Sequence, residues 1–192
     1  MAASATRPEE AIALAGAARF FGDLLVVELD AHRLEALQGP EAAALLGPLG
    51  LTAPEGTGEG VLDELGAQFH AALLRPDGGG APPIASLWTE GRYEGAIAGR
   101  IRTLAESAAL EFDKALTRGA PVDHLGSILH LWAASVERAP WVADEIAEQH
   151  LTWIDPCLVQ MAAVDGFYGE VAGVVSQLAR EIRGTRIQAE QG

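Results

Sequence analysis

The residues best placed to do chemistry stand together in Pro121-Val122-Asp123-His124, between two helical patterns. Asp123 and His124 put a carboxyl group and an imidazole where a helix begins, beside backbone N–H groups that lack a partner within the helix. Asp123 could bind a cation or a guanidinium group, or it could cap the helix and stabilise it by about 0.5–2 kcal/mol. For His124, which flanks an apolar stripe with no nucleophile nearby, a hydrogen-bonded structural role is the simpler interpretation.

The rest of the chain offers no pattern that predicts a metal centre or a catalytic group. The other four histidines include no pair four residues apart, and the single cysteine, Cys157, has no Cys-x-x-Cys partner. The triple glycine at 78–80 is not followed by Lys-Ser or Lys-Thr, so residues 75–83 are interpreted as a linker and not as a phosphate loop. We therefore expect no catalytic residue, no metal and no cofactor.

Composition and charge restrict the possible partners. The chain has 192 residues, 49% of them hydrophobic, with a net charge of −14 and a pI near 4.6. This charge repels nucleic acids and anionic membranes and attracts a cationic partner, although it also simply promotes solubility. No apolar run approaches about 20 residues, the N-terminus lacks the basic region of a secretory signal, and one cysteine permits no internal disulfide. We expect a cytoplasmic protein with no nucleic-acid partner and no membrane insertion.

The elements that must position these residues are expected to be α-helices, because apolar residues recur at helical spacing and no long alternation of period two occurs. The predicted fold is an all-α single globular bundle of about eight to ten helices. It forms one domain over 1–192, with an N-terminal part at 8–118, a hinge at 119–124 and a C-terminal part at 125–184. The spacing predicts helices over 8–25, 34–37, 41–46, 61–73, 93–118, 125–136, 141–153, 156–164 and 167–182.

The tryptophans add one candidate surface residue. Trp132 lies on the regular apolar stripe after residue 125 and Trp153 ends a predicted helix, so core packing is the preferred interpretation of both. Trp88 follows the linker just outside a helical pattern. It is equally consistent with packing in the core and with lining a groove.

Four short motifs follow one another along the chain in a specific order on this helical pattern. Together they resemble the TorD/DmsD-type redox enzyme maturation chaperones, the family that includes the NarJ-like assembly factors, over residues 12–183. The motifs are a Glu-Ser-Val-Tyr-like stretch at 85–92, the Pro-x-Asp-His hinge at Pro121, Asp123 and His124, a His-Leu-x-x-Trp-like element at His150, Leu151 and Trp153, and a Phe-Tyr pair at Phe167 and Tyr168.

The chain departs from the family pattern at three positions, which affect the choice of client and not the helical frame. Ala120 stands where the family often has Glu before the hinge proline. In the stretch at 85–92, Ala85 replaces Glu and Trp88 replaces Tyr.

The resemblance implies a cytoplasmic, non-enzymatic chaperone for a molybdenum-cofactor oxidoreductase. Such proteins bind the twin-arginine signal peptide or the body of the apoenzyme and delay export until the cofactor is inserted. Some members are linked to guanine nucleotide binding and to domain-swapped dimers. The sequence leaves open which oxidoreductase is the client, and whether this chain is a monomer or a domain-swapped homodimer.

A twin-arginine signal peptide has a cationic start and an apolar middle, so its partner needs carboxylates beside an apolar groove. Asp123 and Glu90 are predicted to meet the cationic start, and Leu87 and Trp88 the apolar middle. The predicted set of client-binding residues is Leu87, Trp88, Glu90, Pro121, Asp123 and His124.

Two other functions stay open at this point. The first is a NarJ-like assembly factor that binds the apoenzyme body without recognising a signal peptide. The second is a small all-α hydrolase or nucleotide-binding enzyme, which rests on Asp123 and His124 alone.

Overall fold

Ten α-helices and no β-strand make up the part of the chain that the structure describes, residues 8–74, 82–112 and 117–187 of a computed structural model. Within these residues the extended backbone pairs once, in an isolated antiparallel bridge between Ile84 and His124. The predicted all-α class and the range of eight to ten helices are therefore confirmed. No helix in the described residues combines the length and apolar character that crossing a bilayer requires.

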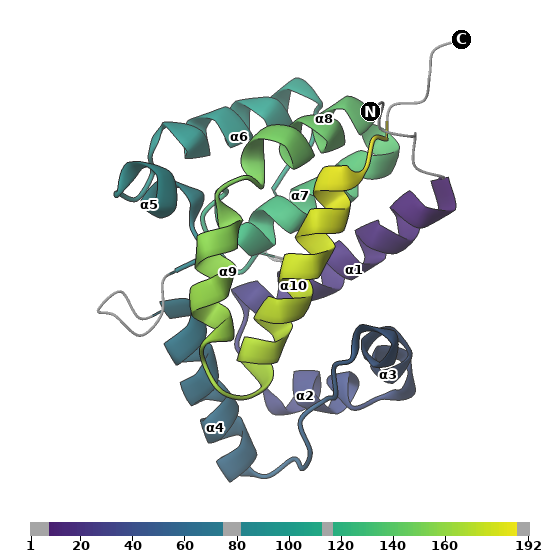
Figure 1. Cartoon of the computed structure of the whole chain (residues 1–192), viewed down its shortest axis with the longest axis vertical. Helices are drawn as coiled ribbons and strands as arrows, with labels where there is room; N and C mark the ends of the chain where they lie inside the picture. The colour runs from purple at the N-terminus through teal and green to yellow at the C-terminus, as the bar shows by residue number, and fades with distance from the viewer. Residues whose placement is uncertain (1–7, 75–81, 113–116, 188–192) are drawn as a thin grey trace.

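The helices are arranged around α7 and α10, with α5, α6 and α8 above and α2, α3 and α4 below in the view of Figure 1. Their bounds are α1 (Pro8–Val26), α2 (Ala31–Leu37), α3 (Pro40–Leu46), α4 (Glu59–Phe69), α5 (Ala85–Glu90), α6 (Ala96–Ser107), α7 (Leu125–Arg138), α8 (Pro140–Glu145), α9 (Ile154–Ala162) and α10 (Phe167–Gly184), with a 3₁₀ turn η1 (Gly47–Leu49) and π-helical turns η2 (His70–Leu74) and η3 (Ile146–His150).

The centre of the core is the packing of α1 on α7, which two glycines make possible. A Cβ atom at Gly126 would lie 2.7 Å from the carbonyl oxygen of Gly22 and 2.5 Å from Cγ1 of Val26. The backbones of the two helices can therefore approach closely only because these positions lack side chains. Trp132 of α7 is fully buried, as predicted. The regions expected as N-terminal and C-terminal parts thus share one core.

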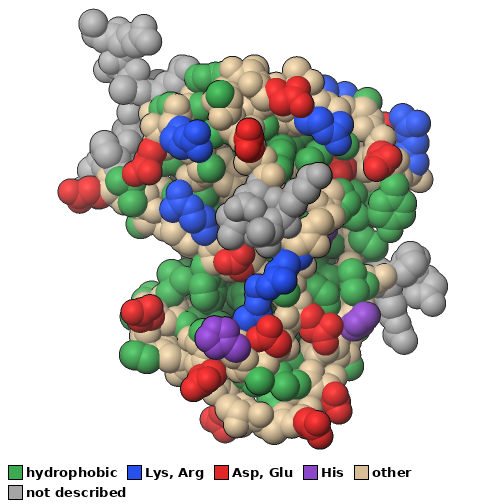
Figure 2. All heavy atoms as spheres, turned by 180° about the vertical axis from the view of Figure 1, so that it is seen from behind, with side chains coloured by type: hydrophobic (Ala, Val, Ile, Leu, Met, Phe, Trp, Pro, Cys, Tyr) green, Lys and Arg blue, Asp and Glu red, His purple; other side chains and the backbone are tan. Residues whose placement is uncertain are grey.

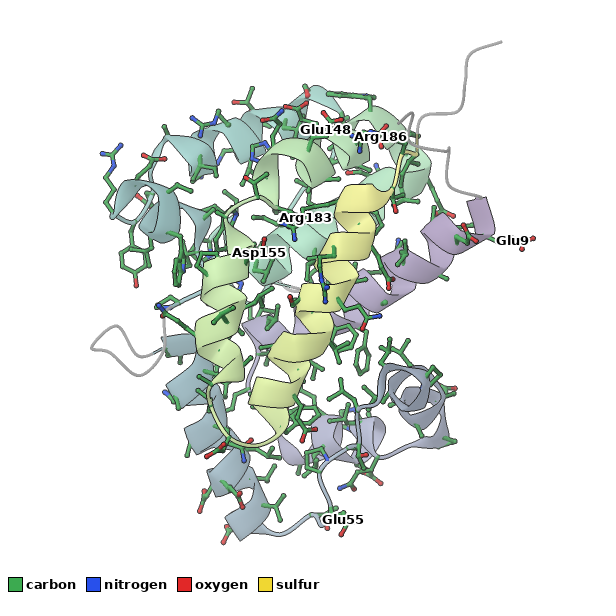
Figure 3. The ribbon with its side chains drawn as sticks, in the orientation of Figure 1. Glu9, Glu55, Glu148, Asp155, Arg183 and Arg186 are labelled. Carbon is green, nitrogen blue, oxygen red and sulfur yellow. The ribbon has the colours of Figure 1, made fainter. Side chains whose placement is uncertain are left out.

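The C-terminal helices are held together by apolar packing and by two ion pairs (Figure 3). Arg183 of α10 donates two hydrogen bonds to Asp155 of α9, at 2.8 and 3.0 Å. Arg186 lies 2.6 Å from Glu148 of η3. These pairs are partly exposed, so they fix the orientation of α10 more than they stabilise the fold.

The predicted long helix over 93–118 is wrong in extent, because α6 begins at Ala96 and ends at Ser107. Ala109 has a φ of 51°, its N–H donates to the carbonyl of Glu106, and the N–H of Leu110 donates to that of Ala105. This pattern is a Schellman C-cap, in which buried Leu110 turns back onto the core. Glycine usually occupies such a position, so the alanine here gave no signal that the helix ends.

Other predicted boundaries differ less. The predicted helix over 141–153 is divided into α8 and η3 and ends at His150, where Leu151 leaves helical geometry. Gly119, the first residue of the predicted hinge, has a positive φ of 79° and lies in a turn. Residues 75–81 of the predicted linker over 75–83, and residues 113–116 of the predicted helix over 93–118, lie outside the described residues. The division into 8–118, 119–124 and 125–184 stays a prediction.

Candidate functional site

Asp123 joins two segments that lie 37 residues apart in the sequence. Its side chain is 1% exposed, and its Oδ2 accepts a hydrogen bond of 3.0 Å from the N–H of Ser86 in the first turn of α5. The carbonyl oxygen of Asp123 also accepts from the N–H of Ala85, at 2.9 Å. Asp123 therefore holds the start of α5, a helix from a distant segment, whereas the alternative to a binding role is that it caps the helix that follows it, and that helix is capped by His124.

His124 completes this junction from the other side of the same turn. Its Nδ1 accepts a hydrogen bond of 3.1 Å from the N–H of Gly126, so the imidazole is the N-cap of α7. Burial lowers the pKa of His124 to about 4, although the Asp123 charge acts in the opposite direction. The neutral imidazole, which can accept through Nδ1, is the form present near neutral pH. The N–H of Leu125 donates to the carbonyl of Pro83 at 2.7 Å and ties the two segments together again.

Glu90 has a comparable capping role one helix further on. Its Oε1 accepts from the N–H of Ile97 and its Oε2 from the N–H of Ala96, both at 2.9 Å. These N–H groups of Ile97 and Ala96, together with Arg92 at 3.3 Å, lower the pKa of Glu90. Both carboxyl groups predicted to meet a cationic partner thus hold helix N-termini in the free chain.

The three remaining residues of the predicted set are more accessible. Leu87 and Trp88 are half-buried on α5, and the indole N–H of Trp88 donates 3.0 Å to the carbonyl of Pro82. Pro121 is exposed. The structure therefore brings all six predicted residues to one junction, with Leu87, Trp88 and Pro121 on its outer side and Asp123 and His124 inside. Their role in client binding stays a prediction.

The junction contains two buried polar atoms that its hydrogen bonds do not use. Oδ1 of Asp123 and Oγ of Ser86 have no hydrogen-bond partner among the described residues. Within those residues, no group of three His, Cys, Asp or Glu side chains is arranged to hold a metal ion. Burial also raises the pKa of the Cys157 thiol to about 12, so this cysteine is not a thiolate near neutral pH. The junction is suited to fixing the orientation of α5, α6 and α7.

A groove of about 610 Å³ lies elsewhere, between α1, α3 and α10. No local sequence pattern predicts this groove, because it is lined by small and large residues of three separate helices. The charged residues that line it are both acidic, and most of its surface is apolar. Its lining is Glu10, Ala13, Leu14, Ala17, Phe21, Ala44, Leu45, Pro48, Leu49, Val174, Gln177, Leu178, Glu181, Gly184 and Thr185.

A more polar hollow of about 590 Å³ lies between α6 and the π-helical turn η3. His150 lines it and is 5% exposed, and its Nδ1 has no hydrogen-bond partner among the described residues. Burial, and secondarily the charge of Arg100, lower the pKa of His150. The carbonyl of His150 accepts a hydrogen bond of 2.8 Å from the indole N–H of Trp153. The His-Leu-x-x-Trp-like element therefore stabilises the turn that it spans.

The sequence model of the nitrate reductase delta subunit family matches residues 34–158, from within α2 to within α9, a stretch that includes the whole junction. The match covers about two-thirds of the chain. No curated protein and no solved structure matched the chain.

Proposed function

The chain belongs to the nitrate reductase delta subunit family, whose members are assembly chaperones of molybdoenzymes and not catalysts, and we propose what it does within that role. It is a cytoplasmic chaperone that binds the apoenzyme of a molybdenum-cofactor oxidoreductase. It recognises the twin-arginine signal peptide of that apoenzyme and delays export until the cofactor is inserted. The observation that carries this proposal is the family match over 34–158.

The junction around α5 is proposed to contact the client through its outer side. Leu87 and Trp88 present partly exposed apolar surface, and Pro121 lies beside the buried turn. Aromatic side chains of this kind dominate many binding surfaces because they bury a large area at a small entropic cost. In this proposal Asp123 positions α5 through the N–H of Ser86. His124 caps α7, and Glu90 at the end of α5 holds the start of α6.

The experiment that tests the proposal compares two forms of one apoenzyme, with and without its signal peptide. The full chain is mixed with each form, and binding is measured by co-purification and by calorimetry. Binding that weakens when the signal peptide is removed is expected. Failure to bind either form of any molybdoenzyme that is encoded beside this protein would contradict the chaperone role.

An assembly factor that binds only the body of the apoenzyme is the second candidate. It is equally consistent with the matching family, which is named for a nitrate reductase subunit. In the same co-purification, equal binding of the two apoenzyme forms would identify this alternative.

The oligomeric state follows from a separate measurement. A domain-swapped dimer would require residues 119–124 to open so that α7 to α10 pack on a second copy, while the closed chain is a monomer. Light scattering over a concentration series distinguishes a constant monomer mass from a rising one.

A further inference from the structure

The groove between α1, α3 and α10 has the shape of a site for a helix. Residues 10, 13, 14, 17 and 21 of α1 form one wall at helical spacing, and residues 174, 177, 178 and 181 of α10 form the other. At 1.5 Å per residue these walls extend over about 10–16 Å, which is two to three turns of a helix laid along them. The 3₁₀ turn η1 and the end of α3 close the third side.

Small side chains keep this groove open. Ala13 of α1 and Ala44 of α3 line it and are exposed, and Ala17 of α1 lines it half-buried. The volume of about 610 Å³ lies in the range of about 300–1,000 Å³ that ligands commonly fill. Side chains of leucine or phenylalanine, spaced three and four residues apart on a partner helix, suit such a surface.

The negative charge around the groove favours a partner helix that carries positive charge. Glu10 and Glu181 are the charged residues among those that line it, and Glu9 is exposed at the start of α1 (Figure 3). The lower half of the molecule is also acidic, and Figure 2 shows few basic side chains on it from behind. Over residues 28–74, Arg33 is the one Lys or Arg against the acids Glu28, Asp30, Glu35, Glu41, Glu55, Glu59, Asp63 and Glu64.

Asp123 is buried, and both oxygens of Glu90 hold the start of α6, so acids on another surface are better placed to meet the partner's cationic residues. We propose that the groove between α1, α3 and α10 binds the signal peptide of the client, an apolar helix with a basic start. This inference rests on the proposed function. It separates the signal-peptide site from the α5 surface, which remains for the rest of the client. A second copy of this chain fits the groove poorly, because it carries the same net charge of −14.

Filling the groove tests its occupancy directly. The probe is a labelled synthetic peptide with an Arg-Arg pair followed by a leucine- and alanine-rich stretch, measured by fluorescence anisotropy on the full chain. Ala13→Trp and Ala44→Trp should each weaken binding by about tenfold or more, because an indole occupies the space of the helix. Ala67→Trp, on an exposed site of α4 outside the groove, is the matched control and should bind within about twofold of the wild type.

Reversing the charge of one acidic residue in the groove tests whether the groove prefers a peptide that begins with basic residues. Glu181 accepts a hydrogen bond of 3.2 Å from Gln177, and Glu64 on α4 accepts an equivalent one of 3.3 Å from Gln68. Glu181→Lys and Glu64→Lys therefore change the net charge equally. Glu181→Lys should slow peptide association about threefold to tenfold more than Glu64→Lys, and high salt should remove most of the difference.

The outcomes separate this inference from the proposed function. Loss of peptide binding in the groove variants, with Trp88→Ala unaffected, supports the groove. Loss in Trp88→Ala alone overturns the groove and leaves signal-peptide recognition intact. If the wild type binds leaderless apoenzyme but not the peptide, signal-peptide recognition fails together with the groove. A dimer in light scattering that the groove variants dissociate would replace the peptide by a second copy and overturn the inference.

Discussion

At the scale of single residues, the acid and the imidazole of the junction are structural groups. Asp123 and His124 satisfy N–H groups at the starts of α5 and α7, where a helix has no internal partner for them. The two residues are adjacent because they lie in the turn that leads directly into α7. Both side chains are buried, and the hydrogen bonds described for them go to backbone N–H groups.

Asp123→Ala should destabilise the fold by about 2 kcal/mol, since it leaves a buried N–H of α5 without an acceptor. Asp30→Ala is the matched control, because Asp30 caps α2 through the N–H of Arg33 on an exposed surface. This control should cost about 1 kcal/mol or less. Urea unfolding gives both values, and hydrogen exchange over residues 84–90 should rise for Asp123→Ala alone. Equal losses in the two variants would contradict the bridging role of Asp123.

The stability of the protein should fall on acidification because of His124. Its pKa is about 4 in the folded state against 6.5 without the fold, so the unfolded chain binds the proton more readily between these values. Stability contributed by the neutral imidazole is therefore complete above pH 6.5 and lost as the pH falls toward 4, by about 3 kcal/mol at most. His150, whose pKa is also lowered, adds to the same trend.

His124→Asn isolates this effect, because asparagine still caps a helix but does not titrate. The difference in unfolding free energy between pH 7 and pH 5 should be smaller in His124→Asn than in the wild type. His32→Asn, at an exposed position of α2, is the control and should leave the difference unchanged. An identical pH dependence in His124→Asn would show that another group is responsible.

At the scale of elements, helix ends decide where the site residues lie. The end of α6 at Ser107 allows the chain to turn at Ala109, which brings Leu110 into the core. The start of α6 is held by Glu90, the last residue of α5. Two short helices are thus fixed relative to each other by one carboxylate.

Ala109→Gly should stabilise the protein by about 0.5–1 kcal/mol, because alanine is strained at a φ of 51° and glycine is not. Ala67→Gly in the exposed interior of α4 is the opposite control and should destabilise by about 0.5–1 kcal/mol. Thermal and urea unfolding of the three proteins measures both changes. Destabilisation by Ala109→Gly would mean that the C-cap is not formed in solution.

At the scale of the whole molecule, one core joins the two ends of the chain. α1 packs on α7 at the close approach of Gly22 and Gly126, and buried residues of α10 lie in the same core. The acidic charge is distributed around this core, so it acts on partners at a distance and contributes to the rate of encounter.

A fragment of residues 125–184 should not fold alone, because the face of α7 that α1 covers would be exposed to water. Circular dichroism of the fragment should show no cooperative thermal transition, whereas the full chain should show a single one. A sharp transition in the isolated fragment would instead support an independent C-terminal unit.

The sequence by itself determined the helical class, most helix positions after residue 125, and the motifs of the junction. Hydrophobic spacing and proline positions act locally, so they are readable without a fold, as for Leu125, Ile128 and Trp132. They did not reveal the end of α6, because an alanine took the place where glycine normally marks a cap.

Only the tertiary structure decided what the junction and the groove are. Asp123 meets Ser86 through a contact across 37 residues of sequence, and no local pattern specifies which distant N–H a carboxyl group will reach. The groove exists because α1, α3 and α10 meet with alanines between them, and such a hollow depends on how three separate elements pack. Packing is a property of the assembled chain, and it places the two predicted binding acids against the backbone N–H groups of α5 and α6.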